Sequence, residues 1–595
     1  MEILRTFFDL LTPREKRNLG LLFVAVVVMA GLEVVSVASI MPFLSVAADP
    51  SSVQENTYLR WVFEALHFSD TYSFLIALGL VAFAALLVSN AFIIFVVWLQ
   101  NRYVWNRNHS ISKRLLRGYL RRPYEYFLTR NSADLSKNIL DEASQVSINM
   151  LRPALNGMAK VIVALAIVGF LVAVDPTLAL LVTVVLGGAY AGIFLLVRQK
   201  LDDYGSRRVE ANRERYQSVS EAFGGIKEVK LRGKEGFFIN EFDMPSRRYA
   251  RYQTLNQVIN KAPRYILEGV AFGGIILIAV YLIATQDNIR QVIPMLGLYA
   301  FAGYRLMPAL QRAFKGIAKA RFNKAALETI HSDTYEPSPL AQPAKAGTEE
   351  KSHGPKNKLE LEDKLIVDDV TFTYPGAHEP AIRRLSLEIS ARTTVGFIGK
   401  TGSGKTTMVD LILGLLRPQE GEIRVDGTPL QGKNLQDWQH AIGYVPQSIY
   451  LADDTIAKNI AFGVPDGAIN YTAMKEAIKS AQIHDFVTEE LPAGLQTVVG
   501  ERGVKLSGGQ RQRIGIARAL YHRPSVIFFD EATSALDQET EEEVMEAVYA
   551  LGKERTVIMI SHRFSTVERA DRIFRLQSGR LVSTGTYESV VQSKL

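Results

Sequence analysis

Long apolar segments dominate the first half of the chain, and stretches rich in basic residues separate them. A helix needs about 20 consecutive, mostly apolar residues to cross the hydrocarbon core of a bilayer. Six segments meet this requirement, at approximately residues 19–47, 73–100, 155–174, 177–197, 264–284 and 291–313. The pattern predicts an α-helical transmembrane domain of six spans over residues 1–332.

The connections between these spans differ in charge. Those at about 101–154 and 198–263 have helical periodicity and few prolines or glycines, so we expect the spans to continue as helices beyond the bilayer. Their basic residues include Arg102, Arg107, Lys113, Arg114, Arg117, Arg121, Arg122, Arg207, Arg208, Arg213, Arg215, Arg247, Arg248 and Arg251. On the other side, only Arg60 and Arg290 lie close to the spans. Because basic loops face the cytoplasm, both termini are predicted to be cytoplasmic.

The stretch QENTYLRWVFEALHF, residues 54–68, is too short to span a bilayer and too apolar for an ordinary solvated loop. The charge pattern places it outside. Within it, Arg60, Glu64 and His67 recur at helical spacing and leave a broad apolar face. We predict an external amphipathic helix near residues 53–68 that lies at the membrane boundary. A helix that merely caps the outer ends of the spans would show the same pattern.

The pattern changes after the last span. Residues 333–360 are rich in Pro, Ala, Lys and Glu and have no apolar period, which indicates a linker. Over residues 361–595, runs of β-branched residues alternate with helical patterns. This alternation predicts a separate α/β domain.

Composition narrows the classes of function. The 595 residues exceed what one compact core accommodates, so at least two domains are expected. The net charge is +7, but the basic residues lie beside apolar spans rather than in one patch, which favours membrane orientation over nucleic-acid binding. The chain has no cysteine, which excludes disulfides, cysteine nucleophiles and cysteine-ligated metals. The first 20 residues lack the pattern of a cleaved signal peptide and suggest a helix at the membrane surface.

A glycine-rich motif in the second domain indicates a phosphate-binding site. GKTGSGKTT, residues 399–407, follows the apolar run TVGFI and precedes the helical pattern TMVDLILGLL. Such a loop directs backbone N–H groups at phosphate oxygens, while Lys405 neutralises charge and Thr406 can bind Mg²⁺. The predicted phosphate-binding residues are Gly399, Lys400, Thr401, Gly402, Ser403, Gly404, Lys405, Thr406 and Thr407.

Two acidic residues end a second apolar run, VIFFDE. Asp530 is predicted to bind the magnesium ion, and Glu531 to act as the general base that activates water. An acidic pair that only caps a following helix is the structural alternative. The phosphate loop in the same domain argues against that alternative.

A second candidate anion site lies between these motifs. LSGGQRQRIGIARAL, residues 506–520, places Ser507, Gly508, Gly509 and Gln510 at a predicted helix start, where N–H groups favour anions. One nucleotide needs only one phosphate-binding loop. A second anion site in the same domain is explained if it binds the phosphates of a nucleotide held by another copy of the chain.

These motifs, in this order, resemble the nucleotide-binding domain of an ABC transporter. Tyr374 in VTFTYPG matches the aromatic that stacks on adenine, and Gln447 in GYVPQSIYL matches the glutamine that contacts Mg²⁺ and water. SALD, residues 534–537, matches the dimer-interface loop, and His562 matches the histidine that contacts the γ-phosphate. The resemblance implies a RecA-like α/β P-loop fold, hydrolysis of Mg-ATP, and a homodimer with two shared sites.

The domain order resembles that of exporter half-transporters. Residues 123–139 and 220–238 are similar to the coupling regions of that family, and residues 497–503 to the loop on which these regions press. The resemblance implies that closure of the two nucleotide domains switches the membrane cavity between two states. An ABC protein acting on DNA or ribosomes would lack six spans, and an exporter-protease would need a cysteine.

Charged residues in the predicted spans bear on the cargo. Glu33, Arg264, Glu268 and Arg305 are such residues, and charges there usually face a cavity or a partner. Pairing with each other, Arg264 with Glu268 in particular, is one interpretation. A polar cavity whose arginines bind a phosphate-bearing headgroup is the other.

The membrane half resembles the lipid-linked oligosaccharide flippases of bacterial protein N-glycosylation. The resemblance rests on SIMPFLSVAAD (39–49), the helix after it, APRYILEG (262–269) and YRLMPALQR (304–312). It implies a flippase of a polyprenyl-pyrophosphate glycolipid in the bacterial inner membrane, whose external helix engages the polyprenyl chain. An exporter of another lipid or of amphipathic drugs is the alternative.

Overall fold

The structure, a computed structural model, describes residues 2–39, 42–43, 46–47, 50, 52–174, 176–285, 289–335, 358–531, 538–561 and 563–591. The chain divides into two compact units. The helical unit comprises Met1–Arg122 and Arg130–Ala341, and the sheet unit comprises Pro123–Thr129 and Gln342–Leu595. Each unit is described separately.

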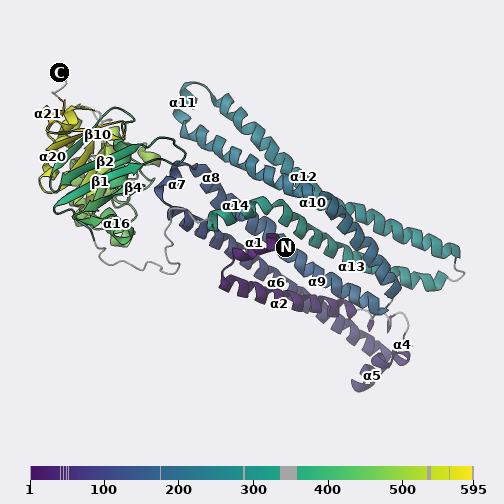
Figure 1. The fold of residues 1–595 in the computed structure, drawn as a ribbon. Helices are drawn as coiled ribbons and strands as arrows, with labels where there is room; N and C mark the ends of the chain where they lie inside the picture. The colour runs from purple at the N-terminus through teal and green to yellow at the C-terminus, as the bar shows by residue number, and fades with distance from the viewer. Residues whose placement is uncertain are drawn as a thin grey trace. The chain divides into compact units, whose positions relative to one another are not determined.

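The helical unit contains long helices that run side by side (Figure 1). Its main helices are α2 (Pro13–Ala38), α6 (Thr71–Leu120), α9 (Arg152–Val174), α10 (Pro176–Gly224), α12 (Glu235–Thr285) and α13 (Ile289–Phe322). Its shorter elements are α1 (Glu2–Asp9), α4 (Ser52–Glu55), α5 (Thr57–Ala65), α8 (Ser132–Lys137), the π-helices η1 (Asn138–Glu142) and η2 (Gln145–Leu151), α11 (Ile226–Leu231) and α14 (Lys324–Tyr335).

The longest helices exceed the thickness of a bilayer. α6 has 50 residues, so at 1.5 Å per residue it is about 75 Å long, against a hydrocarbon core of about 30 Å. α10, with 49 residues, and α12, with 51, have similar lengths. A helix of this length that crosses a membrane extends well beyond the hydrocarbon core, in line with the prediction that the spans continue as helices.

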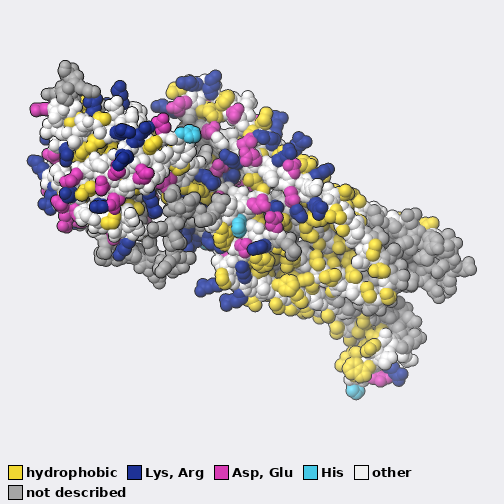
Figure 2. Space-filling view, viewed as in Figure 1, with side chains coloured by type: hydrophobic (Ala, Val, Ile, Leu, Met, Phe, Trp, Pro, Cys, Tyr) yellow, Lys and Arg dark blue, Asp and Glu magenta, His cyan; other side chains and the backbone are white. Residues whose placement is uncertain are grey.

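The surface of the helical unit is apolar along much of its length. Figure 2 shows apolar side chains covering a broad part of the long helices, with charged side chains gathered away from it. On α6 alone, Ile76, Leu80, Phe83, Leu87 and Ile94 are each more than half exposed. A patch of this extent is unfavourable in water and suits lipid. Among the described residues, α6 is the one helix that is apolar and long enough to cross a membrane by length and composition, so the count of six spans stays a prediction.

Close approach of helix backbones depends on two glycines. A Cβ atom on Gly316 of α13 would lie 2.8 Å from the carbonyl oxygen of Pro153, at the start of α9. A Cβ atom on Gly157 of α9 would lie 3.0 Å from the carbonyl oxygen of Arg312. α9 and α13 can therefore pack this closely only because both positions lack a side chain.

The sheet unit is built on two sheets. A six-stranded sheet has the order β10 (Arg580–Gly585), β9 (Arg572–Gln577), β3 (Thr394–Ile398), β8 (Thr556–Ile560), β7 (Val526–Asp530), β6 (Ile442–Val445). Its strands β9, β3, β8, β7 and β6 pair in parallel, and β10 is antiparallel. An antiparallel sheet has the order β2 (Ile382–Ser390), β1 (Lys364–Phe372), β4 (Glu420–Val425), β5 (Thr428–Pro429).

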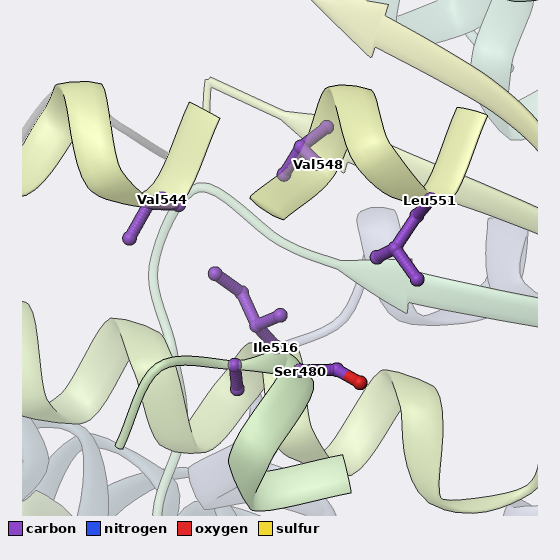
Figure 3. Close-up of a pocket in the computed structure, with 6 residues that line it drawn as sticks. Ser480, Ile516, Val544, Val548 and Leu551 are labelled. Atoms are coloured by element: carbon purple, nitrogen blue, oxygen red, sulfur yellow. The ribbon is translucent and has the colours of Figure 1, made fainter. Parts of the chain in front are cut away.

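Helices cover both faces of the six-stranded sheet. Its helices are α7 (Tyr124–Leu128), α15 (Lys405–Ile412), α16 (Gly432–Gln439), α17 (Ile456–Ile460), α18 (Tyr471–Ser480), α19 (Gly508–Tyr521), α20 (Gln538–Gly552) and α21 (Tyr587–Val591). One core joins α15 and the antiparallel sheet to one face, and another joins α17–α20 to the opposite face. Figure 3 shows Ile516 of α19 facing Val544, Val548 and Leu551 of α20, where the space between them leaves no room for a water molecule.

The structure differs from the sequence-based boundaries in two places. Residues 333–335, assigned to the linker, form the end of α14, because the carboxylate of Asp333 is buried and accepts a hydrogen bond of 2.8 Å from the Asn138 side chain. The helix expected near 53–68 is two helices, α4 and α5, because Asn56 interrupts it. The Asn56 side chain accepts hydrogen bonds from the N–H groups of Tyr58 and Leu59 and so caps the start of α5.

Candidate nucleotide site

The phosphate loop forms between a buried strand and a helix, as the sequence predicts. Every residue of β3 is buried, and α15 begins at Lys405. Gly402 and Gly404 have positive φ angles of 78° and 101°, which favour glycine. No atom lies within 4 Å of where a Cβ on Gly402 would be, so the backbone there is open to a ligand.

The Lys405 side chain forms hydrogen bonds within the phosphate loop. Its ammonium group donates hydrogen bonds to the carbonyl oxygens of Gly399, at 2.9 Å, and Lys400, at 3.3 Å. Burial lowers the pKa of Lys405, while the nearby Glu531 and Asp530 carboxylates act in the opposite direction. The ammonium group of Lys405 therefore lies in a partly dehydrated environment, where its attraction for a phosphate is stronger than in water.

Two hydroxyl groups near Lys405 are available to a ligand. Ser403 is 4% exposed, and its hydroxyl has no hydrogen-bond partner among the described residues. The next residue after Lys405, Thr406, is exposed, whereas Thr407 is buried and its hydroxyl contacts the Tyr374 hydroxyl at 3.0 Å. An unpartnered buried hydroxyl beside an open glycine loop fits an anion with several acceptor oxygens.

The carboxylate predicted to bind metal ends a neighbouring buried strand. Asp530 is the last residue of β7 and is 8% exposed. Tyr444, on the adjacent parallel strand β6, donates its hydroxyl to the Asp530 carboxylate at 3.4 Å. Burial, with the Asp530 charge nearby, raises the pKa of Asp410 on α15 to about 6. Tyr444 and Asp410 are components of this site that the sequence analysis missed.

Glu531 has a strained backbone and a specific partner. Its φ of 48° lies in the left-handed region, which is uncommon for residues other than glycine. The Gln447 side chain donates a hydrogen bond of 2.9 Å to its carboxylate. The two residues predicted to handle water are therefore in contact, although 84 positions separate them in the sequence.

Magnesium fits the residues that the sequence assigned to it. Mg²⁺ commonly takes one or two carboxylates and completes its shell with phosphate oxygens and water. Asp530 supplies the carboxylate, the exposed Thr406 a hydroxyl and Gln447 an amide oxygen, while no cluster of three carboxylates or imidazoles occurs among the described residues. Bound there with a nucleotide, the ion would neutralise phosphate charge during hydrolysis.

The second predicted anion site has the geometry of a capped helix start. Ser507 caps α19 through a capping box with Gln510: each side chain accepts a hydrogen bond from the backbone N–H of the other, at 2.9 and 3.2 Å. Gly508 and Gly509 form the first turn without side chains. This leaves the positive end of α19 accessible to a phosphate.

Two predicted elements lie outside the described residues, namely His562 and the loop 534–537. Tyr374, assigned to adenine stacking, lies partly buried at the end of β1, with its ring edge-on to Phe372 at 5.0 Å between centroids. Its ring remains partly exposed, and its hydroxyl lies next to Thr407 in the first turn of α15.

The charged residues of the predicted spans form ion pairs. The Arg264 guanidinium lies 2.7 Å from the Glu268 carboxylate, one turn later on α12. This ion pair agrees with the first interpretation, in which the two charges partner each other. Glu33 of α2 pairs at 3.0 Å with Lys160 of α9. The sequence analysis missed Lys160, a single basic residue inside an apolar run. The Arg305 side chain lies outside the described part of the chain.

Comparison with known proteins agrees with this geometry. Residues 18–304 match the family model "ABC transporter transmembrane region", and residues 382–534 match "ABC transporter". An "ATP-dependent lipid A-core flippase" from Alkalilimnicola ehrlichii is 33% identical over 501 residues, which covers 83% of this chain and 81% of the relative. A protein of the same description from Thiobacillus denitrificans is 31% identical and covers 83% of each chain.

A solved structure extends the comparison to the fold. The structure of a bacterial Atm1-family ABC exporter with ATP bound aligns with a TM-score of 0.77, covering 98% of this chain and 96% of that one at 22% identity. Neither this structure nor these relatives is an N-glycosylation flippase, so the comparisons support the resemblance at the level of the exporter family. The chain belongs to the ABC transporter family, as an exporter half-transporter that couples ATP hydrolysis to transport.

Proposed function

We propose that the protein is an ATP-driven flippase for a glycolipid with an apolar anchor and a phosphate-bearing saccharide headgroup. The observation that carries the proposal is the extent of the similarity to lipid A-core flippases, which includes more than four-fifths of this chain and therefore most of the membrane half. ATPase domains of transporters for different cargoes resemble each other. Similarity in the membrane half is the part that informs on cargo.

The membrane half supplies charges suited to such a cargo. A charged group within the hydrocarbon core is costly, so each is expected to have a partner or a function. Glu33 and Lys160 are both about 17% exposed in their pair, and Arg264 is half exposed in its pair with Glu268. In the proposal, Lys160, Arg264 and Arg305 attract headgroup phosphates, and Glu33 and Glu268 hold the cations in place between transport events.

The active species is proposed to be a homodimer in the bacterial inner membrane, with six spans per copy and both termini in the cytoplasm. Each Mg-ATP would lie between Lys405 of one copy and Ser507 of the other. The intact set of motifs in one chain supports two competent sites. Glu531 would act as general base at each site, with Gln447 and His562 near the attacking water and the γ-phosphate.

Two glycolipids share the proposed chemistry. Lipid A-core and a polyprenyl-pyrophosphate oligosaccharide both carry phosphate and sugars, but the first has several acyl chains and the second a single polyprenyl chain. The relatives favour lipid A-core over the polyprenyl substrate that the sequence resemblance implied. Export of another lipid or of amphipathic drugs is the alternative.

Stimulation of ATP hydrolysis tests the cargo class. We expect lipid A-core, added to the transporter in nanodiscs, to raise the hydrolysis rate several-fold, and the polyprenyl-linked oligosaccharide to raise it less. The double variant Lys160→Gln, Arg264→Gln should lose this stimulation and keep the basal rate. Stimulation by an uncharged amphipathic drug, with no response to either glycolipid, would favour the drug exporter and contradict the proposal.

A further inference from the structure

Two successive acidic residues at the end of β7 each accept a hydrogen bond from the end of β6 or from the residues just after it. The Tyr444 hydroxyl donates to the Asp530 carboxylate at 3.4 Å, and the Gln447 side chain donates to the Glu531 carboxylate at 2.9 Å. The two strands are parallel, and Tyr444 is paired with Phe528, two residues before Asp530. Because alternate residues of a strand share a face, Tyr444 and Asp530 project from the same face of the sheet.

Apolar packing holds the Tyr444 ring on the face of the sheet that α15 covers. The ring is partly buried and packs against a core that contains Met408 and Val409 of α15 and Phe528 of β7. A phenylalanine would make the same ring contacts at this position. What the tyrosine adds is its hydroxyl, and that hydroxyl contacts Asp530.

The hydrogen bond orients the Asp530 carboxylate. Near neutral pH a tyrosine hydroxyl is ordinarily protonated and an aspartate ionised, so the tyrosine donates and the carboxylate accepts. The accepting atom is Oδ2 of Asp530, and at 3.4 Å the bond is long for an O–H···O hydrogen bond. The contact therefore sets the direction of the carboxylate but neutralises little of its charge, which remains available to a cation.

Magnesium and calcium use carboxylates differently. Mg²⁺ is small, demands near-octahedral geometry and usually takes one or two carboxylates, whereas Ca²⁺ takes more oxygen ligands and can use both oxygens of one carboxylate. Binding through both oxygens of Asp530 would compete with Tyr444 for Oδ2. Binding through one oxygen is compatible with the hydrogen bond. The contact with Tyr444 therefore favours the ion that needs one carboxylate oxygen.

We propose that Tyr444 is a positioning residue that makes Asp530 a one-oxygen metal ligand and so favours Mg²⁺ over Ca²⁺ at the nucleotide site. Residues that hydrogen-bond to metal ligands orient them and tune the affinity for the metal. The inference rests on the assignment of Asp530 as the metal ligand. It does not depend on which cargo is moved.

Three variants separate the hydroxyl from the ring and from the carboxylate. Tyr444→Phe removes the hydroxyl and keeps the ring contacts. Tyr549→Phe is the matched control, because the Tyr549 hydroxyl donates to the Thr566 carbonyl at 2.6 Å and its ring packs on the opposite face of the six-stranded sheet. Both changes remove one tyrosine hydrogen bond from the same unit. Asp530→Asn alters the metal ligand itself.

Thermal unfolding with the non-hydrolysable analogue AMP-PNP measures metal binding by the full-length transporter without turnover. A ligand that binds the folded protein raises its melting temperature, so the readout is the concentration of Mg²⁺, or of Ca²⁺, that gives half of the maximal rise. Tyr444→Phe should increase this concentration about tenfold for Mg²⁺ and less than about threefold for Ca²⁺. Without ligand, and with AMP-PNP in EDTA, its melting temperature should match that of Tyr549→Phe.

The two metals distinguish positioning from a structural defect. Tyr549→Phe should keep the wild-type concentrations for both ions. The proposal is wrong if Tyr444→Phe binds Mg²⁺ like wild type, if it weakens both ions equally, or if it weakens AMP-PNP in EDTA. Asp530→Asn should lose most of the response to Mg²⁺. A wild-type response of Asp530→Asn would refute the assignment of the metal ligand and the proposal with it, whereas a loss in Asp530→Asn with no change in Tyr444→Phe would refute the role of Tyr444 alone.

Discussion

Side chains at the ends of two neighbouring strands, β6 and β7, meet at the nucleotide site. Gln447 reaches Glu531, and Tyr444 reaches Asp530, because β6 and β7 are parallel neighbours whose carboxyl ends lie at one edge of the sheet. Glu531 keeps its left-handed backbone conformation because its N–H donates to the Ile560 carbonyl at 3.1 Å. The geometry places a carboxylate and an amide together at the edge where phosphate and metal would bind.

Asp410 makes stability dependent on pH. Burial and Asp530 raise its pKa to about 6, so the folded chain binds this proton more tightly than the unfolded chain does. The contribution is fully present at low pH and is lost as the pH rises through about 6. Asp410→Asn, which cannot ionise, should therefore stabilise the protein by about 1–2 kcal/mol at pH 8, after discounting for partial exposure.

Thermal unfolding of the solubilised protein without magnesium or nucleotide checks this prediction. The melting temperature of Asp410→Asn should exceed that of wild type at pH 8, and the difference should shrink towards pH 5. The variant Asp466→Asn, at an exposed position, is the control. An equal difference at both pH values would contradict a raised pKa at Asp410.

Contiguous motifs were predictable from the sequence, and contacts between distant segments were not. The phosphate loop, Asp530 and the cap at Ser507 each follow from residues next to each other in the chain. Asp410 and Tyr444 gave no signal, because the first resembles an ordinary polar position on α15 and the second an ordinary strand residue. Lys160 was missed because its neighbours are apolar, and its pairing with Glu33 depends on the packing of α2 against α9.

At the scale of single elements, α5 and the residues just after it divide their apolar side chains between two surfaces. Phe63 and Phe68 pack on Phe74 of α6, with ring centroids 5.2 and 5.3 Å away. This packing agrees with the alternative in which the helix covers the outer ends of the spans. Tyr58 and Trp61 are 83% and 70% exposed. Because tyrosine and tryptophan favour the membrane interface, we expect this second surface to contact lipid headgroups.

Fluorescence of Trp61 tests this assignment. A variant with Trp98, Trp105 and Trp438 changed to Phe leaves Trp61 as the single tryptophan of the chain. In liposomes, its emission should be blue-shifted and quenched by lipids brominated near the headgroup. Emission like that of tryptophan in water, quenched by acrylamide only, would show that α5 stands clear of the membrane.

The close packing of α9 against α13 predicts that a side chain at Gly316 lowers the stability of the protein. Gly316→Ala places a methyl group 2.8 Å from the Pro153 carbonyl oxygen, so the helices must separate. The overpacking should cost about 1–3 kcal/mol and lower the melting temperature by several degrees. Gly192→Ala, where no atom lies within 4 Å, is the matched control and should be neutral or slightly stabilising. Equal effects of the two changes would show that the glycine contact is unimportant.

At the scale of the whole molecule, the two units have different physical requirements. The helical unit exposes a large apolar surface, which is favourable in lipid, whereas the sheet unit has two closed cores and a polar site at its strand ends. The segment Pro123–Thr129, which includes α7, belongs to the sheet unit, although the residues on both sides of it in the sequence belong to the helical unit.

ATP-dependent flipping of lipid A-core in proteoliposomes tests the proposed transport function. Fluorescent lipid A-core is incorporated with the transporter, and its accessibility to a membrane-impermeant quencher is followed after ATP is added. Wild type should flip the lipid in an ATP-dependent manner, and Glu531→Gln should reduce the rate at least 100-fold, because loss of a general base typically costs 10²–10⁴-fold. Flipping at equal rates by wild type and Glu531→Gln, or no flipping of lipid A-core by a wild-type protein that hydrolyses ATP, would contradict the account.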